Sequence, residues 1–295
     1  MAEEGFIPVS GGRVWYLSVG EGGVPLLCLH GGPGFTHYYL EPLEDLADRR
    51  RVIFYDQLGC GRSDRPGNTS LWTASRFVEE LVTVRAALGL DRLHLFGSSW
   101  GGMLAMQYVL DHQPPLESLI LCGSPASMPR WITECNELRA ELPSEEQEIL
   151  DRHEQEGWTA CPEYQGALVT FYRRHVCRMD PWPLGLERSF VEAGYDVYQT
   201  MNGPSEFTVT GNLRDWDVTD RLGEIRVPTL VLGGEHDEAR PAHMQAMRER
   251  IPGSALTIFN DASHLCFYER REEFMARVND FLDGAEARRP EVTRP

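Results

Sequence analysis

A serine in a glycine-rich turn is the strongest sign of chemistry in the sequence. Residues 97–101 read GSSWG, directly after an apolar run and directly before a helical pattern. A G-x-S-x-G segment between a strand and a helix is typical of a nucleophile elbow, a strained turn that needs small residues on both sides of the nucleophile. We therefore predict that Ser99, at the central position, is a nucleophile. The alternative is an ordinary glycine-rich turn.

A second glycine-rich loop lies at residues 30–34, which read HGGPG and follow the apolar run 25–29. Glycines allow backbone N–H groups to approach a ligand closely. Because the residue after an elbow serine donates one N–H to a developing oxyanion, we expect this loop to supply the second donor. The alternative is a plain turn at a strand end. We interpret His30 as structural.

A serine nucleophile needs a base, and the base needs a carboxylate that orients it. Two polar loops follow late apolar runs, GGEHDE at 233–238 and NDASH at 260–264. In proteins with this elbow the chain order is serine, acid, histidine. We therefore predict Asp237 as the acid and His264 as the base. His236 competes for the role of base, and three residues compete for the role of acid: Glu235, Glu238 and Asp261.

The elements that must position these residues alternate between strand and helix. Short apolar runs typical of buried parallel strands lie at 25–29, 52–55, 93–96, 119–122, 229–232 and 256–259. Helical patterns cover 74–88, 103–110 and 274–282, and a hairpin is expected at 6–9 and 13–19. This alternation predicts an α/β fold with a mostly parallel sheet and helices on both faces.

The alternation stops near Pro125 and resumes near Arg221. We therefore predict a core of residues 1–125 and 221–295, interrupted by a mainly helical cap at 126–220. An insertion at the carboxyl end of a parallel sheet lies where ligands bind, and long insertions of this kind are often lids. The alternative is that its many aromatic residues form only a small core of their own. Residues 284–295 are expected to be a loose tail.

Composition excludes several classes of function. The 295 residues carry a formal net charge of −17, which disfavours nucleic acids and anionic membranes as partners. All 28 basic residues are arginine, so chemistry that needs lysine is excluded. The spacing of ligands for a metal is absent, and we expect no metal and no cofactor. Seven cysteines without a C-x-x-C pair, and an N-terminus without a secretory signal, predict a cytoplasmic protein.

The motifs together resemble those of a known family. HGGPG at 30–34, DQLGCGRS at 56–63 and GSSWGG at 97–102 are similar to the motifs of the proline iminopeptidases of the α/β-hydrolase superfamily. Leu58 stands where that family often has arginine. In this difference the chain resembles the tricorn-interacting aminopeptidase subgroup. Residues 201–207 (MNGPSEF), 234–238 (GEHDE) and 263–265 (SHL), with Glu269 shortly after, also look like that subgroup.

The resemblance implies an α/β-hydrolase fold and assigns roles to single residues. Ser99, Asp237 and His264 match the family's catalytic triad. The backbone N–H groups of Gly32 and Trp100 match its oxyanion hole.

The same resemblance implies a site for the substrate's free α-ammonium. Glu206 and Glu238 match two glutamates that hold this group, and Tyr198 matches a tyrosine in the same recess. Two buried carboxylates are costly unless a cation pairs with them, so such a site would reject substrates with a blocked amine. The alternatives are a solvated lid acid for Glu206 and a solvated loop acid for Glu238.

The sequence therefore predicts a serine aminopeptidase that acts through an acyl-enzyme. It would release an N-terminal proline or another apolar residue from short peptides or amino-acid amides with a free N-terminus. One alternative is an esterase, an amidase or a biosynthetic acyl-transfer hydrolase with the same triad. Another is a ligand-binding protein on a disabled scaffold. The oligomeric state is not readable from the sequence.

Overall fold

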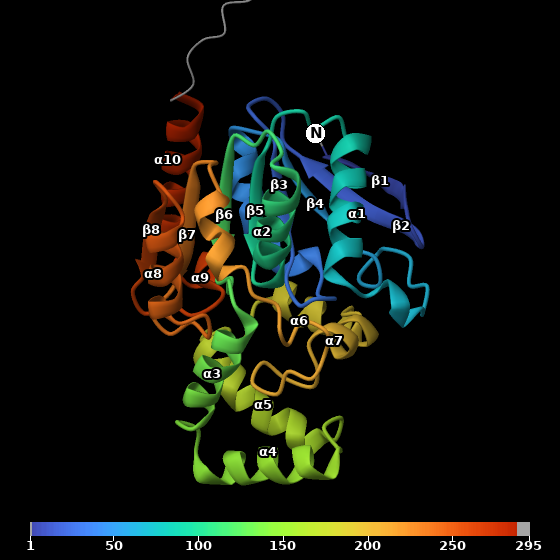
Figure 1. Ribbon diagram of the computed structural model, residues 1–295, viewed down its shortest axis with the longest axis vertical. Coiled ribbons are helices and arrows are strands. Elements are labelled where there is room, and N and C mark those ends of the chain that lie inside the picture. Colours follow the sequence, from blue (N-terminus) through green and yellow to red (C-terminus); the bar gives the residue numbers. More distant parts are fainter. Residues whose placement is uncertain (1, 288–295) are drawn as a thin grey trace, which may run out of the picture.

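One eight-stranded sheet forms the centre of the protein, in the order β1-β2-β4-β3-β5-β6-β7-β8. The computed structural model describes residues 2–287 (Figure 1). The first two strands form an antiparallel hairpin, β2 pairs antiparallel with β4, and all later pairs are parallel. The strands are β1 (Ala2–Val9), β2 (Gly12–Val19), β3 (Leu26–Leu29), β4 (Val52–Tyr55), β5 (His94–Ser98), β6 (Ser118–Cys122), β7 (Thr229–Gly234) and β8 (Ala255–Phe259).

Apolar side chains cover both faces of the sheet, because successive residues of a strand point to opposite sides. In β3, Leu27 and Leu29 join the core beneath one helical layer, whereas Leu26 and Cys28 join the core on the other face. The first layer contains α1 (Ala74–Ala87), α2 (Trp100–His112) and α8 (Pro241–Arg250). The second contains the 3₁₀ helix η1 (His37–Asp48), α9 (Cys266–Glu269) and α10 (Arg271–Ala287).

Five α-helices lie between β6 and β7 and gather at one end of the sheet (Figure 1). They are α3 (Met128–Arg139), α4 (Ser144–Glu156), α5 (Pro162–His175), α6 (Leu184–Val191) and α7 (Tyr195–Met201). The two ends of the predicted insertion run side by side, since Ser127 and Asp217 form an antiparallel bridge. We call residues 126–220 the inserted segment; that it is a separate domain remains a prediction.

The predicted hairpin and all six predicted core strands are present, with ends that differ by a few residues. Several elements were not predicted, among them η1, α8 and α9. The helix η1 buries Leu40, Leu43 and Leu46 at three-residue spacing, but it contains Pro42, which argues against a helix in a sequence. The helix α8 buries only three of its ten side chains, so it has no clear apolar repeat. The expectation of a loose tail from Gly284 is wrong for residues 284–287. There, Leu282 and Ala285 are buried and α10 continues to Ala287; residues 288–295 lie outside the described residues.

Within residues 2–287, no helix combines the length and the apolar character that crossing a bilayer requires.

Packing of the inserted segment predicts a stability effect. Phe171 of α5 is fully buried against Phe207, with ring centroids 5.3 Å apart. We expect Phe171→Ala to lower the free energy of unfolding by about 3–5 kcal/mol, because it leaves a cavity. Urea unfolding measures this change. The control Val191→Ala removes a side chain that is 82% exposed and should change the free energy by about 0.5 kcal/mol or less. Equal effects of the two substitutions would contradict the packing described here.

Candidate active site

Ser99 lies in a strained turn between β5 and α2. Its φ of 56° and ψ of −124° are unusual for a residue with a side chain. The turn is held by the Ser99 N–H, which donates to the Cys122 carbonyl at 2.9 Å. A Cβ on Gly97 would collide with the carbonyl of Gly101, and a Cβ on Gly101 with that of Leu29. Only glycine fits beside the serine, as the nucleophile elbow requires.

The two expected oxyanion donors lie on either side of this turn. Trp100 begins α2, so its backbone N–H has no acceptor within the helix. Gly32 and Ser99 line the same cavity, and a Cβ on the neighbouring Gly31 would lie 2.9 Å from the Ser99 Cβ. The Gly31 N–H donates to the Tyr39 hydroxyl at 2.7 Å, which fixes the loop. That the N–H groups of Gly32 and Trp100 receive an oxyanion remains a prediction.

Gln57 connects the glycine loop at residues 30–34 with Trp100. Its side-chain N–H donates to the His30 carbonyl, and its backbone N–H donates to His30 Nε2, both at 2.9 Å. Its Oε1 accepts from Trp100 Nε1 at 2.9 Å. Burial lowers the pKa of His30 to about 4, so the neutral ring can accept at Nε2. His30 therefore has a structural role, and Gln57 is a positioning residue. Gln57 belongs to the DQLGCGRS motif at 56–63, but the sequence alone assigns it no role.

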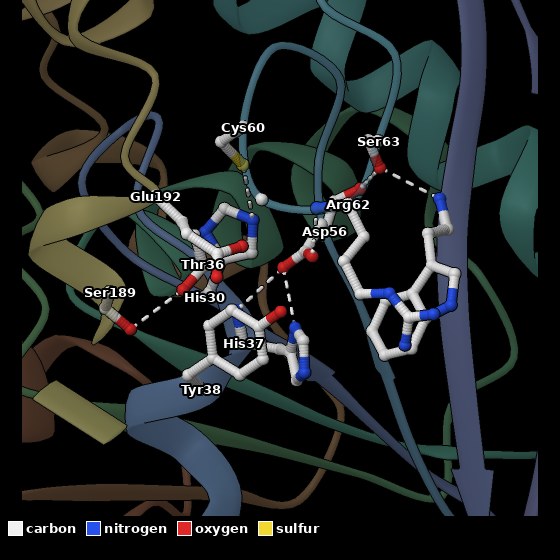
Figure 2. Close-up of polar contacts among 12 residues, drawn as sticks. His30, Thr36, His37, Tyr38, Asp56, Cys60, Arg62, Ser63, Ser189 and Glu192 are labelled. Atoms are coloured by element: carbon white, nitrogen blue, oxygen red, sulfur yellow. Dashed lines mark hydrogen bonds and ion pairs between the residues drawn. The ribbon is translucent and has the colours of Figure 1, made fainter. Parts of the chain in front are cut away.

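A buried carboxylate binds the first residue of η1, just after the glycine loop (Figure 2). Asp56 Oδ1 accepts from the His37 backbone N–H at 2.8 Å and lies 2.8 Å from His37 Nδ1. Asp56 Oδ2 accepts from the Arg62 N–H at 2.9 Å. Burial raises the pKa of Asp56, but the hydrogen bond and charge of His37 outweigh it, so the pKa is lowered. Thr36 Oγ1 lies 2.8 Å from Ser189 Oγ and ties the loop to α6.

His264 and Asp237 form a buried pair, with 2.8 Å between His264 Nδ1 and Asp237 Oδ1. The same Oδ1 accepts from the Ala239 N–H at 2.8 Å. Gly123, at the end of β6, lies directly behind the pair, and a Cβ there would lie 2.7 Å from His264 Nδ1. Three loops at the carboxyl ends of β6, β7 and β8 thus bring together the two residues that the sequence predicts as acid and base.

The competing residues have other surroundings. Glu235 is exposed and accepts from the Asp261 N–H at 2.9 Å. Asp261 is also exposed, and its carboxylate pairs with Arg178 at 3.0 Å and with Arg270 at 3.2 Å. Neither carboxylate is paired with His264 in the described residues, and Glu238 Oε1 lies 3.8 Å from Nε2 rather than at Nδ1, so the geometry favours Asp237 among the candidate acids.

Glu206, Glu238 and Tyr198 lie together, as the resemblance implies. The Tyr198 hydroxyl donates to Glu206 Oε1 at 2.6 Å, and Glu238 Oε1 lies 3.8 Å from His264 Nε2. Burial raises the pKa of Glu206, although the Tyr198 hydrogen bond opposes it. Burial and the Glu206 charge raise the pKa of Glu238 well above its usual range. Glu238 Oε2 is buried and has no hydrogen-bond partner among the described residues.

These groups face an open cavity of about 140 Å³. Its walls include Ser99, His264, Glu206, Glu238 and Tyr198, together with apolar side chains from the inserted segment: Leu168, Tyr172, Val176, Leu186, Phe190 and Tyr195. Among the described residues that line it there is no arginine, so the charged groups of its wall are mainly carboxylates. Across residues 2–287, no cluster of histidine, cysteine, aspartate and glutamate side chains has the make-up of a metal site.

The inserted segment also holds the loop that carries His264. The backbone N–H groups of His264 and Leu265 donate to the carbonyls of His175 and Val176 at 3.1 and 3.0 Å. Ser263 Oγ lies 2.8 Å from Glu269 Oε1, which also accepts from the Arg178 backbone N–H. Glu269 comes shortly after residues 263–265, but the sequence alone assigns it no role. No sequence pattern predicted the contacts of residues 175–178.

Comparison with known proteins agrees with this architecture. The family model for the alpha/beta hydrolase fold matches residues 24–271. The proline iminopeptidase of Heyndrickxia coagulans is 42% identical over 289 residues, which cover 96% of this chain and 100% of that protein. Among solved structures, the proline iminopeptidase of Mycobacterium smegmatis has 41% identity and a TM-score of 0.88, covering 97% of this chain and 99% of that one. VinJ has 40% identity and a TM-score of 0.92, covering 96% and 99%.

The sheet order, the turn at Ser99 and the matched model together define the class as the α/β hydrolases. Relatives of this class with 36–42% identity match almost the full length of the chain. The chain belongs to the proline iminopeptidase family, whose members are serine hydrolases. Its placement in the tricorn-interacting subgroup remains a prediction.

The bridging role of Gln57 predicts a kinetic defect. We expect Gln57→Leu to lower kcat about 5- to 150-fold with little change in KM, because Trp100 Nε1 and the His30 carbonyl lose their partner and both oxyanion donors shift. Steady-state kinetics on a proline arylamide measure the effect.

The matched control for this test is Gln107→Leu. Gln107 Oε1 accepts from Trp216 Nε1 at 2.8 Å, which is the same kind of contact outside the residues that line the cavity. This control should leave kcat unchanged. A normal kcat in Gln57→Leu would show that Gln57 does not position the donors.

Proposed function

We propose that the protein is a serine aminopeptidase in which Ser99 is the nucleophile, His264 the general base and Asp237 the orienting acid. Ser99 would attack the carbonyl of the substrate's first residue, and His264 would take its proton at Nε2 and return it to the leaving amine. Asp237, 2.8 Å from Nδ1, would fix the tautomer and stabilise the imidazolium. Water would then hydrolyse the acyl-enzyme.

The N–H groups of Gly32 and Trp100 would stabilise the tetrahedral oxyanion. Such donors contribute most where they are fixed before the reaction begins. The contacts of Gln57, Tyr39 and Asp56 supply that rigidity. None of these steps uses a metal or an organic cofactor.

The observation that carries the proposal is the pair of carboxylates in the cavity wall. Glu238 is buried, its Oε2 is unpaired among the described residues, and Glu206 bonds only through Oε1 to Tyr198 in the contacts recorded for its carboxylate. A free α-ammonium carries a positive charge and several N–H donors, so it would satisfy both carboxylates. A blocked amine would leave them unpaired, which selects for a free N-terminus.

The remaining cavity wall supports the substrate class. Apolar side chains of the inserted segment favour proline or another apolar first residue, released from short peptides or amino-acid amides. The alternative of an esterase, an amidase or a biosynthetic acyl-transfer hydrolase is not favoured, because near-full-length relatives are named proline iminopeptidases. A cytoplasmic location belongs to the same proposal, and the seven free, buried cysteines support it.

The role of Ser99 predicts that Ser99→Ala loses turnover by roughly 10⁴-fold or more on a proline arylamide, with an unchanged melting temperature. The neighbouring Ser98→Ala is the matched control, and it should keep both turnover and labelling by a fluorophosphonate probe. Continued turnover by Ser99→Ala would exclude Ser99 as the nucleophile.

The carboxylate pair predicts a strong preference for a free amine. We expect hydrolysis of proline and alanine arylamides with a free amine, and at least about a hundredfold lower kcat/KM for their N-acetyl forms, since two charge-assisted contacts are lost. Glu206→Gln should raise KM for the free-amine substrates. Equal rates on free and acetylated amines in the native enzyme would reject the ammonium site while leaving the triad in place.

A further inference from the structure

The nitrogen of His264 that must accept the serine proton faces a carboxylate. Asp237 is bound at Nδ1, and Glu238 Oε1 lies 3.8 Å from Nε2. Within the described residues, the structure records no hydrogen bond between Ser99 Oγ and His264. In the unliganded enzyme the imidazole therefore lies between two carboxylates, one of which stands at the position where the proton transfer must occur.

The charged groups packed around His264 are carboxylates. Asp237 and Glu238 come from the loop after β7, and Glu206 comes from the inserted segment. From α5 the group in contact is the His175 carbonyl, which accepts from the His264 N–H. The other neighbours are the Cys122 thiol of β6 and the Trp131 ring of α3, whose centroid lies 6.4 Å from that of His264.

The balance of these groups favours the protonated imidazole, whose own charge lowers the pKa of Glu238 and so opposes the effect of burial on that carboxylate. Burial alone lowers the pKa of His264, but the charge and hydrogen bond of Asp237 and the charge of Glu238 outweigh it and raise the pKa to about 10. A group with a raised pKa keeps its proton until the pH rises through that value. At neutral pH the unliganded enzyme would hold an imidazolium, which cannot accept a proton from Ser99.

We propose that the substrate's α-ammonium is an activator of the catalytic base as well as an anchor, because binding to Glu238 draws that carboxylate away from His264 Nε2. The inference rests on the proposed function. One positive charge enters the cluster as the ammonium binds, and one proton leaves His264 for solvent. The neutral imidazole can then accept the proton of Ser99.

This mechanism places part of the substrate specificity in the chemical step. A substrate without an ammonium would bind beside an inactive base, so it would lose kcat as well as affinity. Glu238 thereby acts as a specificity-determining residue through His264, whereas Glu206, bonded to Tyr198, acts mainly on binding.

The test uses two substrates and the complete enzyme. Hydrolysis of p-nitrophenyl butyrate, which has no amine, is measured as kcat/KM against pH from 6 to 10, together with alanine p-nitroanilide. We expect Glu238→Gln to move the acid limb of the ester profile down by one pH unit or more, which raises the ester rate at pH 7 about tenfold. The same variant should lose about tenfold or more on the free-amine substrate.

Two further measurements complete the test. Glu235→Gln removes the same charge from the same loop at an exposed position and should leave both profiles unchanged. Methylammonium chloride, compared with sodium chloride at equal ionic strength, should stimulate ester hydrolysis by the native enzyme and not by Glu238→Gln. The methylammonium measurement on the native enzyme tests the proposal even if Glu238→Gln does not fold.

The outcomes distinguish the activation of His264 from the ammonium site of the proposed function. An acid limb that stays in place in a folded Glu238→Gln, or an ester rate of the native enzyme that does not respond to methylammonium, overturns the activation of His264. If the native enzyme still prefers free amines in that case, the ammonium site stands. If the native enzyme shows no such preference, the proposed function itself fails.

Discussion

Buried negative charge around a single imidazole is the constraint on which the rest of this site depends. Asp237, Glu238 and Glu206 surround His264, and no arginine lines the cavity among the described residues, although all 28 basic residues of the chain are arginines. Carboxylates in such a position are costly unless they are hydrogen-bonded or meet a cation. The Tyr198 hydroxyl and the Ala239 N–H satisfy part of this need, and a cationic substrate would satisfy the remainder.

Rigid positioning comes from polar contacts beneath the loops rather than from the loops themselves. Gln57 connects the glycine loop to Trp100, and Asp56 connects the same loop to the neighbouring turn (Figure 2). Both side chains are almost completely buried, so water does not compete for their hydrogen bonds. Neither Gln57 nor Asp56 is among the residues that line the cavity, so both hold their partners without contacting a ligand there.

Local patterns predicted most of the fold and the central residues of the site. The turn at Ser99 and the short apolar strands depend on residues that are close in the sequence, so sequence patterns predict them. The role of Glu206 was predicted only through the resemblance to the family, because no local sequence pattern identifies this residue. The roles of Gln57 and Glu269 depend on contacts between distant segments, and α8 was missed because it buries few side chains.

The backbone hydrogen bonds between residues 175–176 and residues 264–265 limit how this enzyme could be recombined with its relatives. A chimaera that exchanged the whole inserted segment would replace the strand-like contact that steadies His264, and with it the Arg178 N–H bound by Glu269. A crossover point placed before residue 175 would instead alter the apolar wall contributed by α5 while keeping that contact. The wall residues of α5 can thus be exchanged without that contact, whereas Val176 both lines the cavity and holds the histidine loop.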